Sequence, residues 1–188
     1  MEEFLRALLP RCLPAGRAFS VHPFQGKDDL LKKLESRLRA FAGRAPDSSR
    51  IVVLVDRDND DCVQLKRRLE QIAATCGLPT RTRARANWQA ANRIAIEELE
   101  AWYFGDWQAV RAAYPKAALS NKERHRDPDA IVGGTWELLE RVLQRGGYFK
   151  GGIRKLELAR KIGVNFEPRR CSSRSFRNFY DVIMEAAA

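Results

Sequence analysis

The longest uninterrupted apolar run in the chain is Ile51-Val-Val-Leu-Val55, which is continuous rather than alternating. Its β-branched residues indicate a strand that is buried on both faces, as in parallel sheets. Residues 19–24 and 93–97 are interpreted as two further strands, and the polar alternation over 80–85 as an edge strand. Helical spacing of apolar residues follows at 30–41 and 62–76. This order predicts an α/β fold with a mainly parallel sheet flanked by helices.

The remainder of the chain is helical in pattern. A first helix is expected to end at Pro10, and later helices cover 98–105, 107–114, 127–145 and 153–163. A last helix begins with Ser172 or Ser173 as its cap. Residues 43–49 are expected to form a loop. We therefore expect an α/β core over residues 1–105 and a helical C-terminal region over 106–188 that packs on it.

Charge narrows the classes of partner. The chain has 188 residues, and its 34 Lys and Arg against 24 Asp and Glu give a net charge of +10. Nucleic acid is the first partner to consider for such a surface, although a basic surface without a specific partner is the other interpretation. The two histidines are far apart and no CxxC pair occurs, which argues against zinc. Without an apolar run of membrane-spanning length, we expect a cytoplasmic protein that does not enter a membrane.

Basic residues dominate the segment from Arg141 to Tyr180, the last of them being Arg177, and only Glu157 and Glu167 oppose them there. A stripe of this kind can follow a phosphate backbone, and a solvated helix face explains it equally well. Lys27 adds a cation near the start of a predicted helix, where phosphate is favoured. The candidate contacts to nucleic acid are Lys27, Lys150, Arg154, Lys155, Arg160, Lys161 and Arg174.

Acidic residues follow the central strand at once, in the turn Asp56-Arg-Asp58-Asn-Asp60-Asp61. In open α/β sheets, ligands bind just beyond the carboxyl ends of the strands. Crowded carboxylates repel one another, and a divalent cation such as Mg²⁺ or Mn²⁺ stabilises them. The turn therefore predicts a metal site, and a capped turn without a ligand is the alternative.

A second acidic stretch, Glu97-Glu98-Leu-Glu100-Ala-Trp102, follows the predicted strand 93–97. If that strand neighbours the central one, the carboxylates of both acidic stretches reach the same ion. The alternative is that Glu98 and Glu100 lie there only because acidic residues are favoured at helix N-termini. Asp56, Asp58 and Glu97 are the candidate catalytic residues, because metal-assisted phosphoryl transfer uses carboxylates of this kind. The candidate metal ligands are Asp56, Asp58, Asp60, Glu97, Glu98 and Glu100.

The Asp56-x-Asp58 pair also occurs in other types of site. A calcium loop of the EF-hand type needs Gly at its sixth and Glu at its twelfth position, where this chain has Asp61 and Arg67. A phosphatase of the haloacid-dehalogenase type also places Asp-x-Asp after a buried strand, and it stays open as a third interpretation. Some glycosyltransferases also use Asp-x-Asp to hold a metal and a nucleotide sugar, but no other feature of this sequence supports that function.

The two acidic motifs, together with Phe24-Gln-Gly-Lys27, resemble bacterial proteins of domain-of-unknown-function family 4276. The resemblance extends to Asp106, to Tyr148 with Lys150, and to the aromatic end around Phe176. That family resembles Toprim domains, which implies a Toprim-like parallel sheet between helices. It also implies Mg²⁺-dependent cleavage of nucleic acid, in a nuclease component of a bacterial defence-type module with an ATPase partner.

The start of the chain departs from the Toprim pattern, which begins with an apolar strand that ends in Glu. Here Met1-Glu2-Glu3 resembles only the entry into the following helix. The alternative function is therefore a non-catalytic subunit with a degenerate Toprim site, which binds nucleic acid or an ATPase. A sheet without that strand exposes an edge, so a homodimer is also expected.

Overall fold

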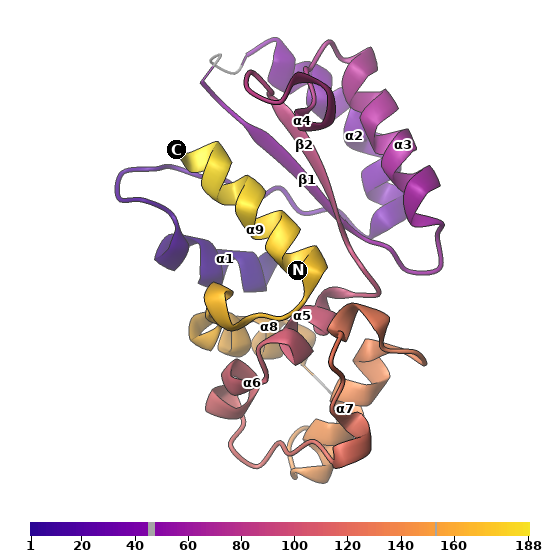
Figure 1. Cartoon of the computed structure of the whole chain (residues 1–188), viewed down its shortest axis with the longest axis vertical. Helices are drawn as coiled ribbons and strands as arrows, with labels where there is room; N and C mark the ends of the chain where they lie inside the picture. The colour runs from indigo at the N-terminus through magenta and orange to yellow at the C-terminus, as the bar shows by residue number, and fades with distance from the viewer. Residues whose placement is uncertain (45–47, 153) are drawn as a thin grey trace.

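A two-stranded parallel sheet lies in the upper half of the molecule in the computed structural model, which describes residues 1–44, 48–152 and 154–188 (Figure 1). Strand β1 is Ile51–Asp56 and strand β2 is Ala90–Ala95. Their register pairs Ile51 with Ala90 and Asp56 with Ala95. The predicted α/β class, a parallel sheet flanked by helices with a helical C-terminus, is confirmed.

Helices cover both faces of this sheet (Figure 1). Helices α2 (Lys27–Ala42) and α3 (Cys62–Thr75) form one apolar cluster with Val53 and Val55 of β1. Helix α9 (Arg174–Ala187) contacts β2 from the other side, where Val182 packs with Trp88 and Ala91. The short helix α4 (Arg81–Ala84) precedes β2. Burial on both faces accounts for the continuous apolar pattern of β1.

The lower half of the molecule is helical. Its elements are α1 (Glu2–Cys12), α5 (Leu99–Gly105), α6 (Trp107–Ala113), α7 (Thr135–Arg145) and α8 (Lys155–Asn165), with short 3₁₀ turns η1 (Asn121–Glu123), η2 (Pro128–Ala130) and η3 (Pro168–Arg170). Phe4 of α1 packs edge-on against Tyr103 and Phe166 in the largest apolar cluster. Helices α1 and α8 approach closely at Gly163, where a Cβ atom would lie 2.8 Å from the Cβ of Ala7. The core thus joins the first helix to the C-terminal helices, and the boundary at residue 105 stays a prediction.

Two predicted strands are wrong. Residues 19–24 have no strand pairing, since Pro23 lacks an N–H and the segment bonds within itself through Ser20 and His22. The segment 80–85 forms α4 instead, and only Thr80 makes an isolated bridge, to Ala90. Its alternation was polar throughout, so a strand there had no apolar face to bury.

Several predicted bounds also differ. Strand β2 lies at 90–95 rather than 93–97, because small alanines fit between α3 and α9 although they are poor strand formers. The predicted helix 127–145 is split by Gly133 and Gly134, which have φ values of 91° and 87°. Helix α1 continues past Pro10 to Cys12. Residues 45–47 of the predicted loop and residue 153 of the predicted helix lie outside the described residues.

The two edges of the sheet differ. The N–H groups of Ile51 and Arg57 bond to β2, so the alternate residues Val52 and Leu54 direct theirs to the other side. Among the described residues, no backbone group pairs with that outer edge of β1. At the outer edge of β2, the carbonyl of Asn92 accepts hydrogen bonds from Lys66 and Arg93. In the described part of the chain, the β1 edge therefore has no backbone partner, whereas the β2 edge is partly covered.

Within the described ranges, each helix is too short or too polar to cross a lipid bilayer.

Candidate metal and nucleic-acid site

The two acidic motifs meet at the carboxyl end of the sheet. Asp56 is the last residue of β1, and Glu98 directly precedes α5, which follows β2. Because the strands are parallel neighbours, both of these ends lie at the same edge of the sheet. The turns there are unusual, since Asp58 and Glu97 have positive φ values of 50° and 62°. Such backbone conformations are costly for residues other than glycine, and they concentrate at functional sites.

Asp56 is a largely desolvated carboxylate with one oxygen that lacks a partner in the described part of the chain. Its pKa is raised to about 6, chiefly by burial and in smaller part by the charges of Asp58 and Glu98. The amino group of Met1 and the backbone N–H of Leu99 oppose this shift. Its Oδ1 atom is buried and has no hydrogen-bond partner among the described residues. A buried carboxylate oxygen without a partner is energetically unfavourable unless a proton or a cation reaches it.

Glu100 lies in the first turn of α5, close to Asp56. Burial raises the pKa of Glu100 to about 7, and the charges of Glu98 and Asp56 act in the same direction. Its own backbone N–H and the ammonium of Lys155 oppose the shift. Asp56, Glu98 and Glu100 thus influence one another electrostatically, and we call them the inner acidic group.

Tyr103 lies one turn after Glu100 and is fully buried. Burial raises its pKa well above the ordinary value, and Glu100 and Asp56 add to this effect. Its hydroxyl also has no hydrogen-bond partner in the described part of the chain. Tyr103 was missed by the sequence analysis, although its position three residues after Glu100 places both on one side of the helix.

Glu98 is held in place by the start of α7. Its carboxylate accepts hydrogen bonds from the Thr135 hydroxyl at 2.9 Å and the Trp136 backbone N–H at 3.0 Å. These bonds satisfy a donor at the helix N-terminus, where negative charge is favoured. Glu98 therefore joins the inner acidic group to the helical half of the protein.

The remaining acidic candidates already have cationic partners. Lys27 Nζ lies 2.9 Å from a carboxylate oxygen of Asp58 and 2.9 Å from one of Asp60. Burial alone would lower the pKa of Lys27, but its hydrogen bonds to Asp60 and Asp58 raise it. Arg57 forms an ion pair with Glu97. We call Asp58, Asp60 and Glu97 the outer acidic group, and each of its carboxylates has a cationic partner within the protein, although Lys27 is shared by two of them.

The chemistry of the inner acidic group fits a hard cation. Its donors are carboxylate oxygens, and the Oδ1 atom of Asp56 lacks a partner among the residues described. In the described ranges, however, no three carboxylate, imidazole or thiol groups already converge as metal ligands. Binding an ion there therefore requires side-chain movement. The metal ligands and catalytic residues stay predictions.

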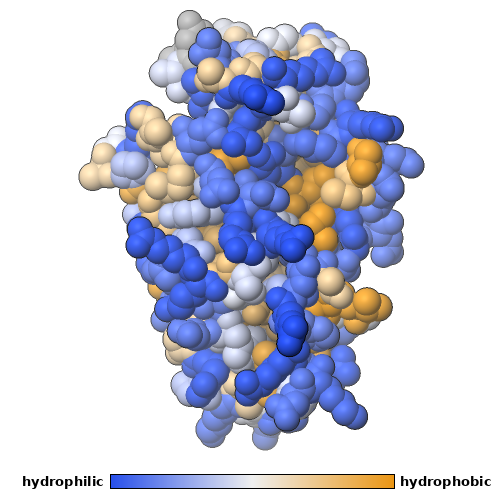
Figure 2. Space-filling view, viewed as in Figure 1, coloured by the Kyte–Doolittle hydropathy of each residue, from blue (hydrophilic) through white to orange (hydrophobic). Residues whose placement is uncertain are grey.

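The predicted phosphate contacts are distributed over several elements. Lys155 begins α8 and its charge lowers the pKa of Glu100, whereas Lys27 forms ion pairs with Asp58 and Asp60. Lys161 pairs with Glu157 at 2.8 Å. Hydrophilic residues cover much of the face in Figure 2. The exposed candidates are Lys150, Arg154, Lys155, Arg160, Lys161 and Arg174.

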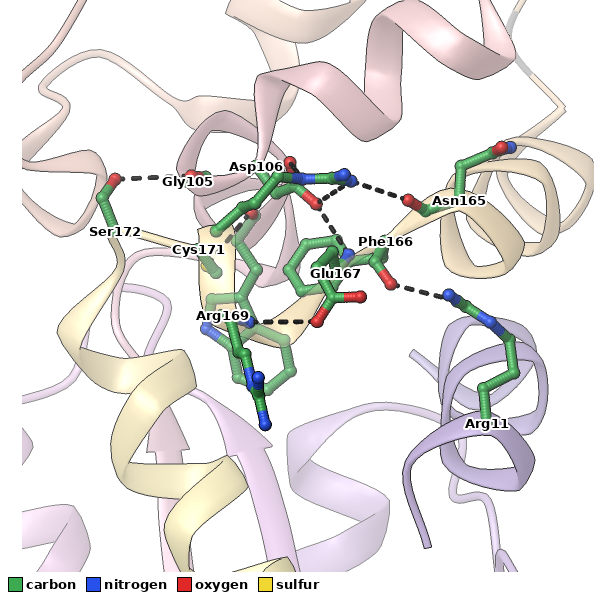
Figure 3. A network of polar contacts seen from close by, with 11 residues as sticks. Arg11, Gly105, Asp106, Asn165, Phe166, Glu167, Arg169, Cys171 and Ser172 are labelled. Atoms are coloured by element: carbon green, nitrogen blue, oxygen red, sulfur yellow. Dashed lines mark hydrogen bonds and ion pairs between the residues drawn. The ribbon is translucent and has the colours of Figure 1, made fainter.

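Part of the basic segment has a structural role instead. Arg170 forms an ion pair with the buried carboxylate of Asp106, which also accepts a hydrogen bond from the backbone N–H of Glu167 (Figure 3). Arg145 pairs with Glu123 at 2.7 Å. The run of basic residues from Arg141 to Arg177 is therefore not one continuous phosphate-binding surface.

A comparison with protein families matches residues 1–183 to the family described as "Domain of unknown function (DUF4276)". The chain belongs to the DUF4276 family. The match includes both acidic groups, Tyr103, Trp136 and Lys155, so the site lies within the DUF4276 domain. No curated protein and no solved structure matches the chain. The relation to Toprim domains stays a prediction.

Proposed function

We propose that this DUF4276 protein is a Mg²⁺- or Mn²⁺-dependent nuclease component with a Toprim-like site, acting in a bacterial defence-type module. The observation that carries the proposal is the buried Oδ1 atom of Asp56, which has no partner within the described ranges. Its neighbours Glu98 and Glu100 supply further carboxylate oxygens at the carboxyl end of the sheet. A divalent cation relieves the repulsion among these groups.

The proposed chemistry is hydrolysis of a phosphodiester bond. A cation bound at the inner acidic group supplies neutralisation of phosphate charge and activation of a water molecule. Asp56 is the first ligand, and Glu100 is held close enough for its pKa to respond to the charge of Asp56. Asp58 and Glu97 take part only after they leave Lys27 and Arg57, respectively. Among the candidate phosphate contacts, Lys155 is close enough for its charge to lower the pKa of Glu100.

Metal binding tests the assignment directly. We expect Mn²⁺ binding by calorimetry to the wild-type chain, and its loss in Asp56→Asn, which keeps the shape of the side chain. Asp181→Asn is the matched control, because Asp181 is an exposed residue of α9 outside both acidic groups. If Asp56→Asn binds Mn²⁺ as tightly as the wild type, Asp56 is not a metal ligand and the proposed site is wrong.

Cleavage is tested with the same variants. Single- and double-stranded DNA and RNA are incubated with Mg²⁺, with Mn²⁺ or with EDTA, and the products are separated by electrophoresis. We expect cleavage that requires the metal and is retained by Asp181→Asn. Loss of a buried metal ligand reduces turnover by a factor of about a hundred or more. Equal cleavage by Asp56→Asn and wild type would contradict a catalytic site at Asp56.

A non-catalytic subunit that binds nucleic acid or an ATPase is the second candidate. It is favoured by the outer acidic group, since Lys27 and Arg57 already form ion pairs with Asp58, Asp60 and Glu97 without a metal. Such a subunit binds nucleic acid equally well in Mg²⁺ and in EDTA, apart from ionic strength, and its affinity falls steeply with salt. Asp56→Asn leaves this binding unchanged. Metal-independent binding without cleavage would therefore favour this second function.

A further inference from the structure

Trp136 of α7 and Lys155 of α8 form a contact at the starts of their helices. The Lys155 Nζ atom lies 3.8 Å from the centroid of the Trp136 ring. Trp136 is partly exposed and Lys155 is exposed, whereas Trp88 and Trp102 are buried in the core. A cation over an accessible aromatic face is attracted by the ring, and the same face can stack with a nucleobase.

This pair is attached to the inner acidic group. The backbone N–H of Trp136 donates a hydrogen bond to the Glu98 carboxylate at 3.0 Å. The ammonium of Lys155 acts on Glu100, whose pKa it lowers against the larger effect of burial. Each member of the pair therefore interacts with a carboxylate of the proposed site. A base on the Trp136 ring would bring its own phosphate to this region.

The surroundings of the pair combine apolar and cationic side chains. Leu156, the residue after Lys155, is 73% exposed, and Val132 in the loop before α7 is 95% exposed. Figure 2 shows hydrophobic surface protruding at the lower right, where the loop before α7 lies in Figure 1. Arg154 adds a guanidinium whose side chain is 81% exposed. Positive charge complements a phosphate backbone, and exposed apolar groups suit unstacked bases rather than a duplex surface.

We propose that Trp136 and Lys155 form a stacking site for a nucleobase of single-stranded nucleic acid. The base takes the place of the Lys155 ammonium on the ring, and the ammonium moves to the adjoining phosphate. This inference rests on the proposed function, because it names the form of nucleic acid that the same site takes. Duplex bases are already stacked on one another, so the Trp136 ring adds little to duplex binding.

Binding in EDTA isolates this contact from catalysis. A fluorescein-labelled strand of about twelve thymidines, within the length that such sites cover, is titrated at low salt and followed by anisotropy. We expect Trp136→Ala to weaken single-strand binding by roughly 5- to 100-fold, the range typical of one stacked base. Trp136→Phe keeps an aromatic face and retains most of the affinity. Binding of a duplex that contains the same strand changes less than about twofold in either variant.

Two controls exclude loss of the fold. Trp107→Phe is the matched control, because Trp107 is also partly exposed but stacks on Phe104, with ring centroids 5.4 Å apart. Circular dichroism and thermal unfolding of each variant are compared with the wild type. A folded Trp136→Ala that binds the single strand as tightly as the wild type overturns the proposal. Equal weakening of single-strand and duplex binding also overturns it, because the ring then acts as support for Lys155 alone.

The role of Lys155 has a separate readout. Lys155→Gln removes one cation, so we expect the slope of log affinity against log salt to become shallower by about 0.7 for a single strand. An unchanged slope contradicts a phosphate contact of Lys155. Failure of the proposed nuclease function is detected separately, by the metal-dependent cleavage assay on the wild-type chain. If Trp136→Ala loses binding while no metal-dependent cleavage is found, the stacking site stands and the nuclease function does not.

Discussion

Arg170 and Asp106 form a bidentate pair within the helical half of the protein. Arg170 Nε donates to Asp106 Oδ1 at 2.9 Å, and a terminal guanidinium nitrogen donates to Oδ2 at 3.0 Å (Figure 3). The Asp106 side chain is 1% exposed, and the Arg170 side chain is 39% exposed. Asp106 lies between α5 and α6, and Arg170 belongs to η3, so the pair connects segments that are far apart in sequence.

Loss of Arg170 is expected to destabilise the protein strongly. Arg170→Ala leaves the buried carboxylate of Asp106 with its backbone donor alone, which costs about 3 kcal/mol of unfolding free energy. Arg169→Ala is the control, because Arg169 is exposed and is expected to change the free energy by less than about 0.5 kcal/mol. Urea denaturation measures both values. A loss below about 1 kcal/mol for Arg170→Ala would show that water replaces the guanidinium at Asp106.

The inner acidic group predicts a stability that falls as pH rises from about 4 to 8. In the folded protein the pKa values are about 6 for Asp56 and about 7 for Glu100, whereas both lie near 4 in an unfolded chain. Between these values the folded state binds more protons than the unfolded state, so raising the pH favours unfolding. Each group thereby costs about 3–4 kcal/mol at the alkaline end of this range.

Glu100→Gln tests this pH dependence. The variant keeps a neutral group at the buried position, so we expect it to be more stable than wild type at pH 8 and to show a flatter pH profile in urea denaturation. Glu35→Gln, which alters an exposed ion pair on α2, is the control. Mg²⁺ is expected to stabilise the wild type more at pH 8 than at pH 5, because the ion binds ionised carboxylates. An identical slope for Glu100→Gln and wild type would contradict the prediction.

Lys27 predicts competition between an ammonium and a metal ion. Lys27→Met leaves Asp58 and Asp60 without their shared cation, and because both carboxylates are about half exposed the cost is about 1 kcal/mol. We expect the variant to gain a larger increase in melting temperature from Mg²⁺ than the wild type does. Lys33→Met, which removes a different ion pair from α2, serves as the control. A response to Mg²⁺ no larger than that of Lys33→Met would show that no ion replaces the ammonium.

The open edge of β1 predicts self-association. An unpaired strand edge can pair with the same edge of a second copy, so we expect concentration-dependent dimers in sedimentation velocity. Val52→Pro removes an N–H group that points away from β2, so it should block the dimer while the sheet is retained. Val53→Pro removes a hydrogen bond to β2 and is expected to unfold the sheet. A monomer at every concentration would refute edge pairing.

Local patterns were sufficient for several elements. The continuous apolar run predicted β1, and the Asp61 side chain caps α3 by accepting a hydrogen bond from the Gln64 N–H at 2.8 Å. Ser173 likewise caps α9. These features arise from residues that are adjacent or three positions apart, so the sequence contains the signal directly. The family resemblance was also evident from short motifs and is confirmed over residues 1–183.

Strand β2 and the two acidic groups required tertiary structure. Alanines form β2 only because helices close on both of its faces, and propensity alone does not indicate this. All six predicted ligands lie near the end of the sheet, but the sequence did not show that Lys27 pairs with Asp58 and Asp60. It also did not show that Glu98 caps α7.

The chain by itself therefore specified which residues carry charge and which segments bury an apolar face. The fold decided which charged groups meet. Arg170 of the basic segment pairs with the buried Asp106, and the Lys155 ammonium lies over the Trp136 ring. The physical reason is the separation in sequence of the residues that interact. Helix caps and apolar periodicity act between near neighbours in sequence, whereas the pKa of Asp56 and the pairing of Lys27 depend on groups that only folding brings close.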